Sequence, residues 1–165
     1  MSVTPIKFQD RRSVEQVEES VDLAPKFDER GLITAVTTDA TSGELLMQGF
    51  MNDAALRRTI ATGEAHYYSR SRDTLWHKGA TSGLVQKVIE LMIDDDQDCV
   101  WIKASVAGGA SCHVGYRSCF YRRIPVADEY TEKQQSGTVI LEFTDTTKVF
   151  DPNEVYGDAP NPTVL

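Results

Sequence analysis

Short apolar segments alternate with polar turns along most of the chain, at intervals typical of a β-rich domain. β-branched residues at 31–37 and apolar residues at 44–50 predict two strands joined by a turn at 39–43. The same reasoning predicts further strands at 65–69, 85–93, 99–106, 119–124 and 137–143. We therefore expect an α+β, β-rich fold with compact, mostly antiparallel sheets and one or two helices.

One helix is well marked by its ends. Asn52 stands where an N-cap is expected and Gly63 where the helix should stop, with Ala55, Leu56, Thr59 and Ile60 spaced along one face. A shorter helix is expected at 13–21. We divide the chain into a loosely held N-terminal arm (1–26), a central domain (27–124) and a C-terminal extension (125–165) packed on the same domain, ending in an extended tail.

Composition and charge narrow the class of protein. The chain has 165 residues, 41% hydrophobic and 25% charged, which is ordinary for a soluble globular domain. Its polar start has no apolar run, so we expect a cytoplasmic protein with reduced thiols and no membrane partner. A net charge of −8 argues against nucleic-acid binding. Segment 65–123 is basic outside its aspartate cluster, however, which suits a small anionic ligand.

The aspartate cluster is the first candidate site. Asp94, Asp95, Asp96 and Asp98 fall within five residues and Cys99 follows them. In an extended backbone Asp94, Asp96 and Asp98 would project to one side, and their charges would repel unless a cation such as Mg²⁺ neutralised them. The spacing does not fit a calcium helix-loop-helix, which needs Gly at loop position 6 and Glu at position 12. The alternative is a solvated acidic turn.

The thiols are the second candidate site. All three cysteines lie between positions 99 and 119, and no Cys-x-x-Cys pair occurs, which argues against a zinc ribbon or finger. Cys99, Cys112 and Cys119 could supply the three protein ligands of a catalytic Zn²⁺, or they could be small buried residues. His113 adjoins Cys112 and would be a natural proton-transfer group beside a metal-activated water.

A polar, glycine-punctuated segment, predicted as one loop over 69–83, is the third candidate site. It carries the donors that a phosphate needs, namely guanidinium, ammonium and hydroxyl groups: Ser69, Arg70, Arg72, Lys78, Thr81 and Ser82. Trp76 within it would stack on a base or anchor the loop to the core. A basic surface loop is the alternative reading.

Together these motifs resemble the phosphoribosyl-AMP cyclohydrolase family of histidine biosynthesis. The residues that carry the resemblance are Ser69-Arg70-Ser71-Arg72, Leu75-Trp76, Lys78-Gly79, Thr81-Ser82-Gly83, the aspartate cluster, Ser111-Cys112-His113 and Arg117-Ser118-Cys119. The match covers about residues 27–123. It implies an intertwined cytoplasmic homodimer that uses Zn²⁺ and Mg²⁺ to hydrolyse the N1–C6 bond of the adenine ring in phosphoribosyl-AMP, a small nucleotide.

The resemblance also implies roles for individual residues. Cys112 and Cys119 would hold Zn²⁺ with one donor from the partner subunit's acidic turn. Asp94, Asp96 and Asp98 would hold Mg²⁺, and His113 would act in catalysis as a zinc-bound hydroxide attacks C6. We expect substrate contacts from the polar segment and one later arginine: Ser69, Arg70, Arg72, Trp76, Lys78, Thr81, Ser82 and Arg117.

The chain departs from the family pattern at the third zinc ligand. Asp95 stands where the family usually has cysteine, and Cys99 follows four residues later, about 13 Å away in an extended strand at about 3.3 Å per residue. Either an Asp oxygen replaces the thiolate or the backbone delivers Cys99. Two other functions remain open at this point: a zinc-stapled interaction module, and a Mg²⁺-dependent pyrophosphohydrolase acting through the aspartates.

Overall fold

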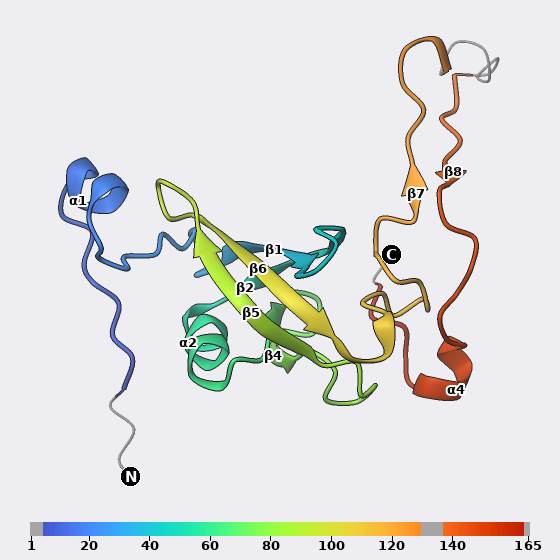
Figure 1. Ribbon diagram of the computed structural model, residues 1–165, viewed down its shortest axis with the longest axis horizontal. Coiled ribbons are helices and arrows are strands. Elements are labelled where there is room, and N and C mark those ends of the chain that lie inside the picture. The colour runs from blue at the N-terminus through green and yellow to red at the C-terminus, as the bar shows by residue number, and fades with distance from the viewer. Residues whose placement is uncertain (1–4, 130–136, 164–165) are drawn as a thin grey trace.

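A four-stranded sheet lies at the centre of the computed structural model, which describes residues 5–129 and 137–163 (Figure 1). Its strand order is β2-β1-β6-β5. The antiparallel pairs are β1 (Ile33–Asp39) with β2 (Leu45–Met51), and β5 (Gln86–Ile93) with β6 (Cys99–Val106). The two hairpins meet through one parallel pairing, β1 with β6.

One face of this sheet is covered by helix α2 (Asp53–Thr62) and a hairpin of β3 (His66–Ser69) and β4 (Thr74–His77). Asn52 caps α2 by accepting the Ala55 N–H at 2.8 Å, and Gly63 ends it with φ 69, as predicted. The shared core consists of buried apolar side chains from these elements, among them Ile33, Ala35, Met51, Leu56, Tyr67, Val100 and Ile102.

The predicted fold class is confirmed: the described residues are β-rich and mostly antiparallel, with three α-helices where one or two were expected. The single loop predicted over 69–83 is wrong. A tight turn at 70–73 returns the chain into β4, where Trp76 pairs with Tyr67 across the hairpin. Leu75 and Trp76 are partly buried, and their packing stabilises this strand. The polar residues on either side of them hid the apolar pattern that would have predicted it.

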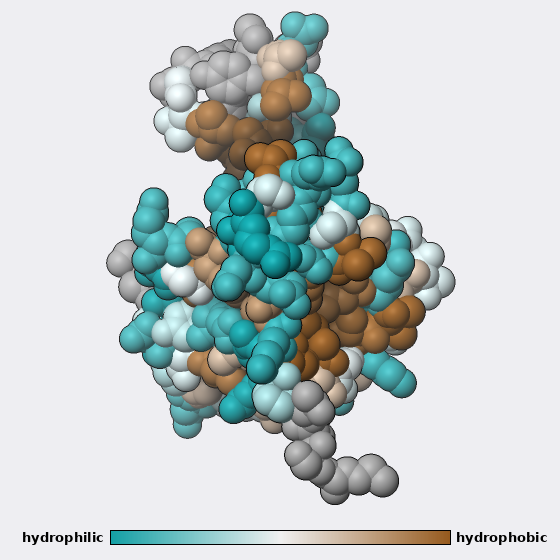
Figure 2. All heavy atoms as spheres, turned by 90° about the vertical axis from the view of Figure 1, so that its left-hand side faces the viewer, coloured by the Kyte–Doolittle hydropathy of each residue, from teal (hydrophilic) through white to brown (hydrophobic). Residues whose placement is uncertain are grey.

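The C-terminal extension, together with the last residues of the central domain, forms a ribbon that projects from the sheet (Figure 1). Its strands, β7 (Arg122–Arg123) and β8 (Glu142–Phe143), are far shorter than the predicted 119–124 and 137–143. Apolar side chains gather on this ribbon (Figure 2), including Phe120, Ile124, Val126, Ile140 and Phe143, all exposed. The predicted extended tail is interrupted by helix α4 (Pro152–Tyr156), which Asp151 caps.

The N-terminal arm carries α1 (Val14–Glu19), capped by Ser13, and lies against the turn between β5 and β6. Residues 9–26 are therefore docked, whereas the sequence suggested a loose arm. Across the described residues, no helix combines the length and apolar character needed to cross a membrane.

Candidate metal and substrate site

Cys112 and Cys119 lie on a loop that follows β6 and the short 3₁₀ turn η1 (Ala107–Gly109). Within this loop the Cys112 N–H donates to Tyr116 O at 3.2 Å, and the Gly115 N–H donates to Cys112 O at 3.0 Å. The Cys119 N–H donates to Leu46 O at 2.7 Å and so fastens the end of the loop to β2. These backbone bonds return the chain on itself and bring the two sulfurs into contact.

A hydrogen bond between the two sulfurs shifts their pKa values in opposite directions. The bond from Cys119, helped by the Val114 N–H and the Lys78 ammonium, lowers the pKa of Cys112 to about 6 against the opposing effect of burial. The same bond is the main reason that the pKa of Cys119 is raised. The shared bond thus favours ionisation of one sulfur of the pair over ionisation of both. Thiolate sulfur is a preferred Zn²⁺ donor, and binding of the metal would release the proton that the two sulfurs share. This donor set therefore fits Zn²⁺.

Lys78 is buried below the thiol loop with 3% of its surface exposed. Its ammonium donates to Ser111 O at 2.8 Å and lies 5.1 Å from the centre of the Trp76 ring. Burial lowers its pKa, and the negative charge of the cysteine pair, Cys119 and Cys112, acts in the opposite direction. Lys78 takes part in none of the carboxylate ion pairs found among the described residues. Its charge faces the sulfurs, and a phosphate contact would require the side chain to leave this position.

His113 is half-buried beside the thiols, and its Nε2 atom is buried with no hydrogen-bond partner among the described residues. Burial, and then the charge of Lys78, lower its pKa, while the side chain of Asn161 opposes the shift. A half-buried imidazole with a lowered pKa and one unengaged nitrogen is suited to accept a proton from a neighbouring water.

The C-terminal segment covers this loop. The Val149 N–H donates to Gly115 O at 2.7 Å, and the Asn161 side chain contacts His113. The Ser71 hydroxyl donates to Pro162 O at 3.5 Å, so the same segment reaches the turn between β3 and β4. Residues 149–162 therefore connect two of the three motifs, a role that the sequence did not suggest.

The aspartate cluster forms the turn between β5 and β6 and is not extended. The Asp94 N–H donates to Cys99 O at 3.1 Å, and the Asp94 carboxylate accepts the N–H groups of Asp98 and Cys99, both at 2.9 Å. The extended-strand argument, with its 13 Å separation of residues 95 and 99, is therefore wrong. Consecutive rather than alternate residues converge, because Asp94, Asp95 and Asp96 each place a carboxylate oxygen within 4.8 Å of the others.

Like charges are crowded at this turn. The pKa of Asp98 is raised by burial and then by the charges of Asp96 and Asp94. The Lys26 ammonium lies 3.8 Å from carboxylate oxygens of both Asp96 and Asp98. A hard divalent cation prefers an oxygen donor set of this kind and would relieve the same repulsion, so the turn fits Mg²⁺.

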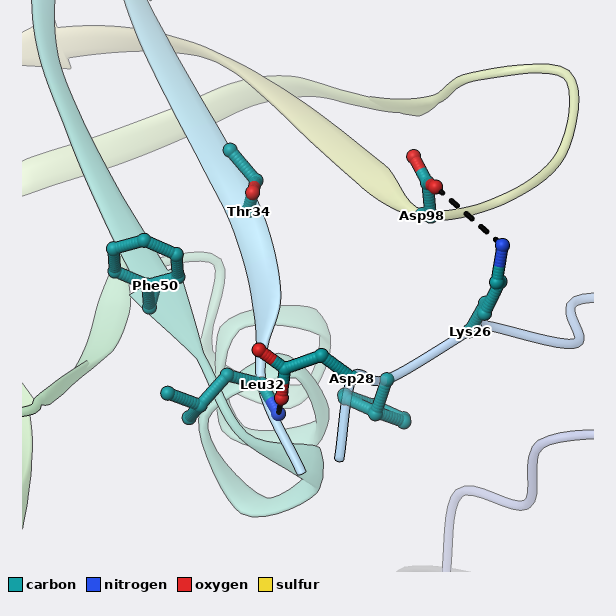
Figure 3. Close-up of a pocket in the computed structure, with 7 residues that line it drawn as sticks. Lys26, Asp28, Leu32, Thr34, Phe50 and Asp98 are labelled. Atoms are coloured by element: carbon teal, nitrogen blue, oxygen red, sulfur yellow. Dashed lines mark hydrogen bonds and ion pairs between the residues drawn. The ribbon is translucent and has the colours of Figure 1, made fainter. Parts of the chain in front are cut away.

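A cavity of about 200 Å³ opens beside the acidic turn (Figure 3). Lys26 and Asp98 line one side of it and Phe50 lines another. The Arg70 guanidinium lies 4.1 Å from the centre of the Phe50 ring. Phe50 thus lines the cavity and also contacts an arginine of the predicted phosphate-binding segment.

The acidic turn and the thiol loop stand at opposite ends of β6 (Figure 1). The eight residues of this strand span about 23 Å at about 3.3 Å per residue. A single copy of the chain therefore does not bring Asp95 or Cys99 to the Cys112 and Cys119 pair.

Three predicted substrate residues lie together at the β3–β4 turn. Arg70 and Arg72 are exposed there, and the Arg72 Nε–H donates to the Ser69 hydroxyl at 3.1 Å. The Arg72 guanidinium lies 5.5 Å from the centre of the ring of Trp76, which is half-buried on β4. The two guanidinium groups are accessible to an anion.

The other predicted substrate residues have different surroundings. Thr81 is exposed in the loop after β4, where the Ser82 hydroxyl accepts the Leu84 N–H at 3.2 Å. Arg117 is held by two carboxylates, Glu44 at 2.5 Å and Asp39 at 3.1 Å. These ion pairs tie the thiol loop to the β1–β2 hairpin, so Arg117 is not a free guanidinium here.

Asn161 and Gln97 were missed by the sequence reasoning. Asn161 stands in a proline-containing tail and Gln97 inside the aspartate cluster, and neither position has a local pattern that indicates a function. Both act through contacts with residues far away in the chain.

Comparisons with known proteins agree with the motifs. A family model described as phosphoribosyl-AMP cyclohydrolase matches residues 47–121. A protein of Rhodopseudomonas palustris (strain TIE-1) is 55% identical over 143 residues, covering 87% of this chain and 90% of its own length. One from Bradyrhizobium diazoefficiens is 50% identical over 141 residues, covering 86% and 94%. Both relatives carry the name phosphoribosyl-AMP cyclohydrolase. At this identity and coverage the chain belongs to the phosphoribosyl-AMP cyclohydrolase family, as its motifs predicted.

Proposed function

We propose that the chain hydrolyses the N1–C6 bond of the adenine ring in phosphoribosyl-AMP, a step of histidine biosynthesis, with water adding at C6. Membership of the family supports the overall reaction. The observation that carries the chemistry is the contact between Cys112 and Cys119, next in the chain to a histidine whose Nε2 is buried and unpartnered among the described residues.

The surrounding residues suit addition of water to an electron-poor ring. Ribosylation at N1 withdraws electrons from the purine and makes C6 open to attack. A zinc ion held by Cys112 and Cys119 would lower the pKa of water from about 15.7 to about 7, so that a nucleophile is present at neutral pH. Lys78 offsets the negative charge of the sulfurs, and His113 accepts the proton at Nε2 and returns it to the opening ring.

The third metal donor comes from a second copy of the chain. The length of β6 separates the acidic turn from the thiol pair, so a shared site in a homodimer would place one subunit's turn at the other's thiols. The exposed apolar side chains of the β7–β8 ribbon offer a surface for such a partner. Of the two candidate donors we favour Asp95, which is exposed at the tip of the turn, whereas Cys99 is half-buried in β6 and paired with Thr34.

Charged groups away from the thiols position the nucleotide. The exposed guanidinium groups of Arg70 and Arg72 bind its phosphate, and the carboxylates of the acidic turn would hold a Mg²⁺ ion that could supply a second charged contact. Both serve orientation, because the bond that breaks lies on the base.

Two substitutions test the proposal. Cys112→Ala and His113→Ala are each expected to abolish ring opening, followed by its absorbance change, while circular dichroism shows a folded protein. Ser105→Ala, at an exposed position on β6, is the control and should retain activity. Full activity in either Cys112→Ala or His113→Ala would refute the assigned role.

Chelation separates this function from the two alternatives. Removal of zinc should leave a folded, inactive dimer, whereas a zinc-stapled interaction module would unfold. A pyrophosphohydrolase acting through the aspartates would release pyrophosphate without zinc. Release of pyrophosphate by the zinc-free protein would count against ring opening as the function.

A further inference from the structure

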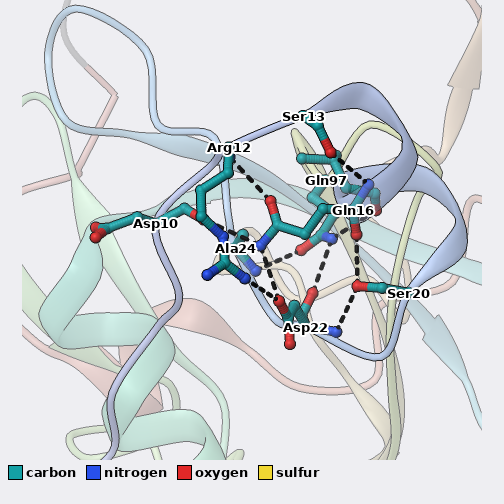
Figure 4. Close-up of polar contacts among 9 residues, drawn as sticks. Asp10, Arg12, Ser13, Gln16, Ser20, Asp22, Ala24 and Gln97 are labelled. Carbon is teal, nitrogen blue, oxygen red and sulfur yellow. Dashed lines mark hydrogen bonds and ion pairs between the residues drawn. The ribbon is translucent and has the colours of Figure 1, made fainter.

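Gln97 is buried although it stands among four aspartates, with 4% of its surface exposed. Its side-chain amide is fully engaged by the N-terminal arm (Figure 4). The Oε1 atom accepts the Ala24 N–H at 2.8 Å, and Nε2 donates to Val17 O at 2.8 Å and to Asp22 O at 3.1 Å. The acidic turn is thus anchored from its interior by segment 9–26, which we call the strap.

Two further contacts join the strap to the backbone of the turn. The Lys26 N–H donates to Gln97 O at 2.7 Å. The Arg11 guanidinium donates to Ala24 O at 2.7 Å and to Asp96 O at 2.9 Å, so it bridges the strap and the turn. Together with the Gln97 amide, these bonds hold the main chain of two consecutive turn residues.

The conformation that the strap holds is unfavourable on its own. Gln97 has φ 60, in the left-handed region that residues with a Cβ disfavour. The same turn gathers the carboxylates of Asp94, Asp95 and Asp96, whose charges repel one another. The Lys26 ammonium, also on the strap, lies 3.8 Å from Asp96 and Asp98. A docked strap therefore stabilises the arrangement that a cation needs.

We propose that docking of the strap and binding of a divalent cation at the acidic turn are thermodynamically coupled, with Gln97 as the positioning residue. This inference rests on the cation site of the proposed function and adds its regulation by a segment that precedes the residues matched by the family model. Because coupling is reciprocal, the strap should strengthen cation binding and the cation should stabilise the strap to the same extent.

The first test measures Mg²⁺ affinity by calorimetric titration of the full-length, zinc-loaded protein with the metal alone. Gln97→Ala is expected to weaken affinity about tenfold, within the range usual for coupled sites, and Arg11→Ala should weaken it in the same direction. Arg12→Ala is the matched control, since this neighbouring arginine is 66% exposed and its ion pair, with Asp22, lies within the strap. Its affinity should stay within about twofold of wild type. Equal affinities for Gln97→Ala and Arg12→Ala would overturn the proposal.

Gln97→Gly separates the side-chain contacts from the backbone conformation, and it serves if Gln97→Ala does not fold. Glycine adopts φ 60 readily but makes no bond to the strap. If the contacts carry the coupling, Gln97→Gly weakens Mg²⁺ binding as well. Wild-type affinity in Gln97→Gly would show that Gln97 does not act as a positioning residue.

The reciprocal readout is hydrogen exchange at the Ala24 and Lys26 amides, which donate to Gln97. Mg²⁺ alone should slow their exchange in wild type and not in Asp96→Asn. If exchange at both amides is unchanged by Mg²⁺ in a protein that opens the ring, the coupling is refuted and the proposed function stands. If the wild type has no ring-opening activity, the function fails while the coupling is still decided by these two measurements.

Discussion

Gly115→Ala should loosen the thiol loop more than any ordinary loop substitution. The φ of Gly115 is 103, and a Cβ at this position would lie 2.5 Å from Phe150 O and 3.3 Å from Lys148 Cδ. The first of these atoms is backbone, so the loop or the segment carrying Phe150 has to move. Gly63 offers the comparison, because its φ is 69 and a Cβ there meets nothing within 4 Å.

The two substitutions have different expected costs. Gly63→Ala carries only the left-handed penalty, about 1 kcal/mol. Gly115→Ala carries the same penalty and two further costs, because the new Cβ meets Phe150 O and the bond from the Val149 N–H to Gly115 O is displaced. We expect the free energy of unfolding to fall by about 3 kcal/mol in total. For a chain of this length, a loss of about 1 kcal/mol lowers the midpoint of thermal unfolding by about 3 °C. We therefore expect a decrease of about 3 °C for Gly63→Ala and of about 9 °C for Gly115→Ala.

Scanning calorimetry measures both midpoints, and zinc content after dialysis reports the state of the loop. Gly115→Ala should also lose zinc, because the bonds that bring Cys112 and Cys119 together start from this turn. Equal decreases in midpoint for the two variants, with zinc retained in both, would show that the tail does not brace the thiol loop.

Four other predictions, tested with five substitutions, concern separate contacts. Asp95→Asn should lower zinc content measured by atomic emission while Cys99→Ser leaves it unchanged, and the opposite result would make Cys99 the third donor. Lys78→Met should weaken zinc affinity by about 10- to 100-fold in competition with a chelator, and unchanged affinity would remove Lys78 from the site. Asn161→Ala should lower kcat with KM unchanged, since Asn161 contacts His113; a change in KM alone would contradict this. Burial lowers the pKa of His66 below 6.5, so on acidification the unfolded chain binds this proton before the folded chain does. The free energy of unfolding should therefore decrease as the pH is lowered from about 7.5 to about 5.5. The urea midpoint of His66→Phe should change less over that range than the wild-type midpoint, and an equal change would exclude His66 as the cause.

Local pattern was enough to predict most of the elements in this chain. The caps of α2 at Asn52 and Gly63 and the strands β1, β2, β5 and β6 depend on neighbours in sequence, so propensity and periodicity identify them. Strand β4 was missed because its two apolar residues stand between polar ones and acquire their meaning only by pairing with β3. The three motifs, each a short run of chemically distinctive residues, identified the family.

The tertiary structure decided how those motifs stand toward one another. The sequence determined that thiols and carboxylates gather in two short segments on either side of a predicted strand at 99–106. The pairing of β6 with β1 and β5 keeps that strand extended, so that the two segments stay at its opposite ends. Likewise, burial turned Lys78 from an apparent phosphate donor into a charge facing two sulfurs. The roles of Gln97 and Asn161 follow from contacts with residues far away in the chain, Val17 and His113 respectively. Such contacts depend on topology and burial, and these are properties of the whole folded chain that no local pattern carries.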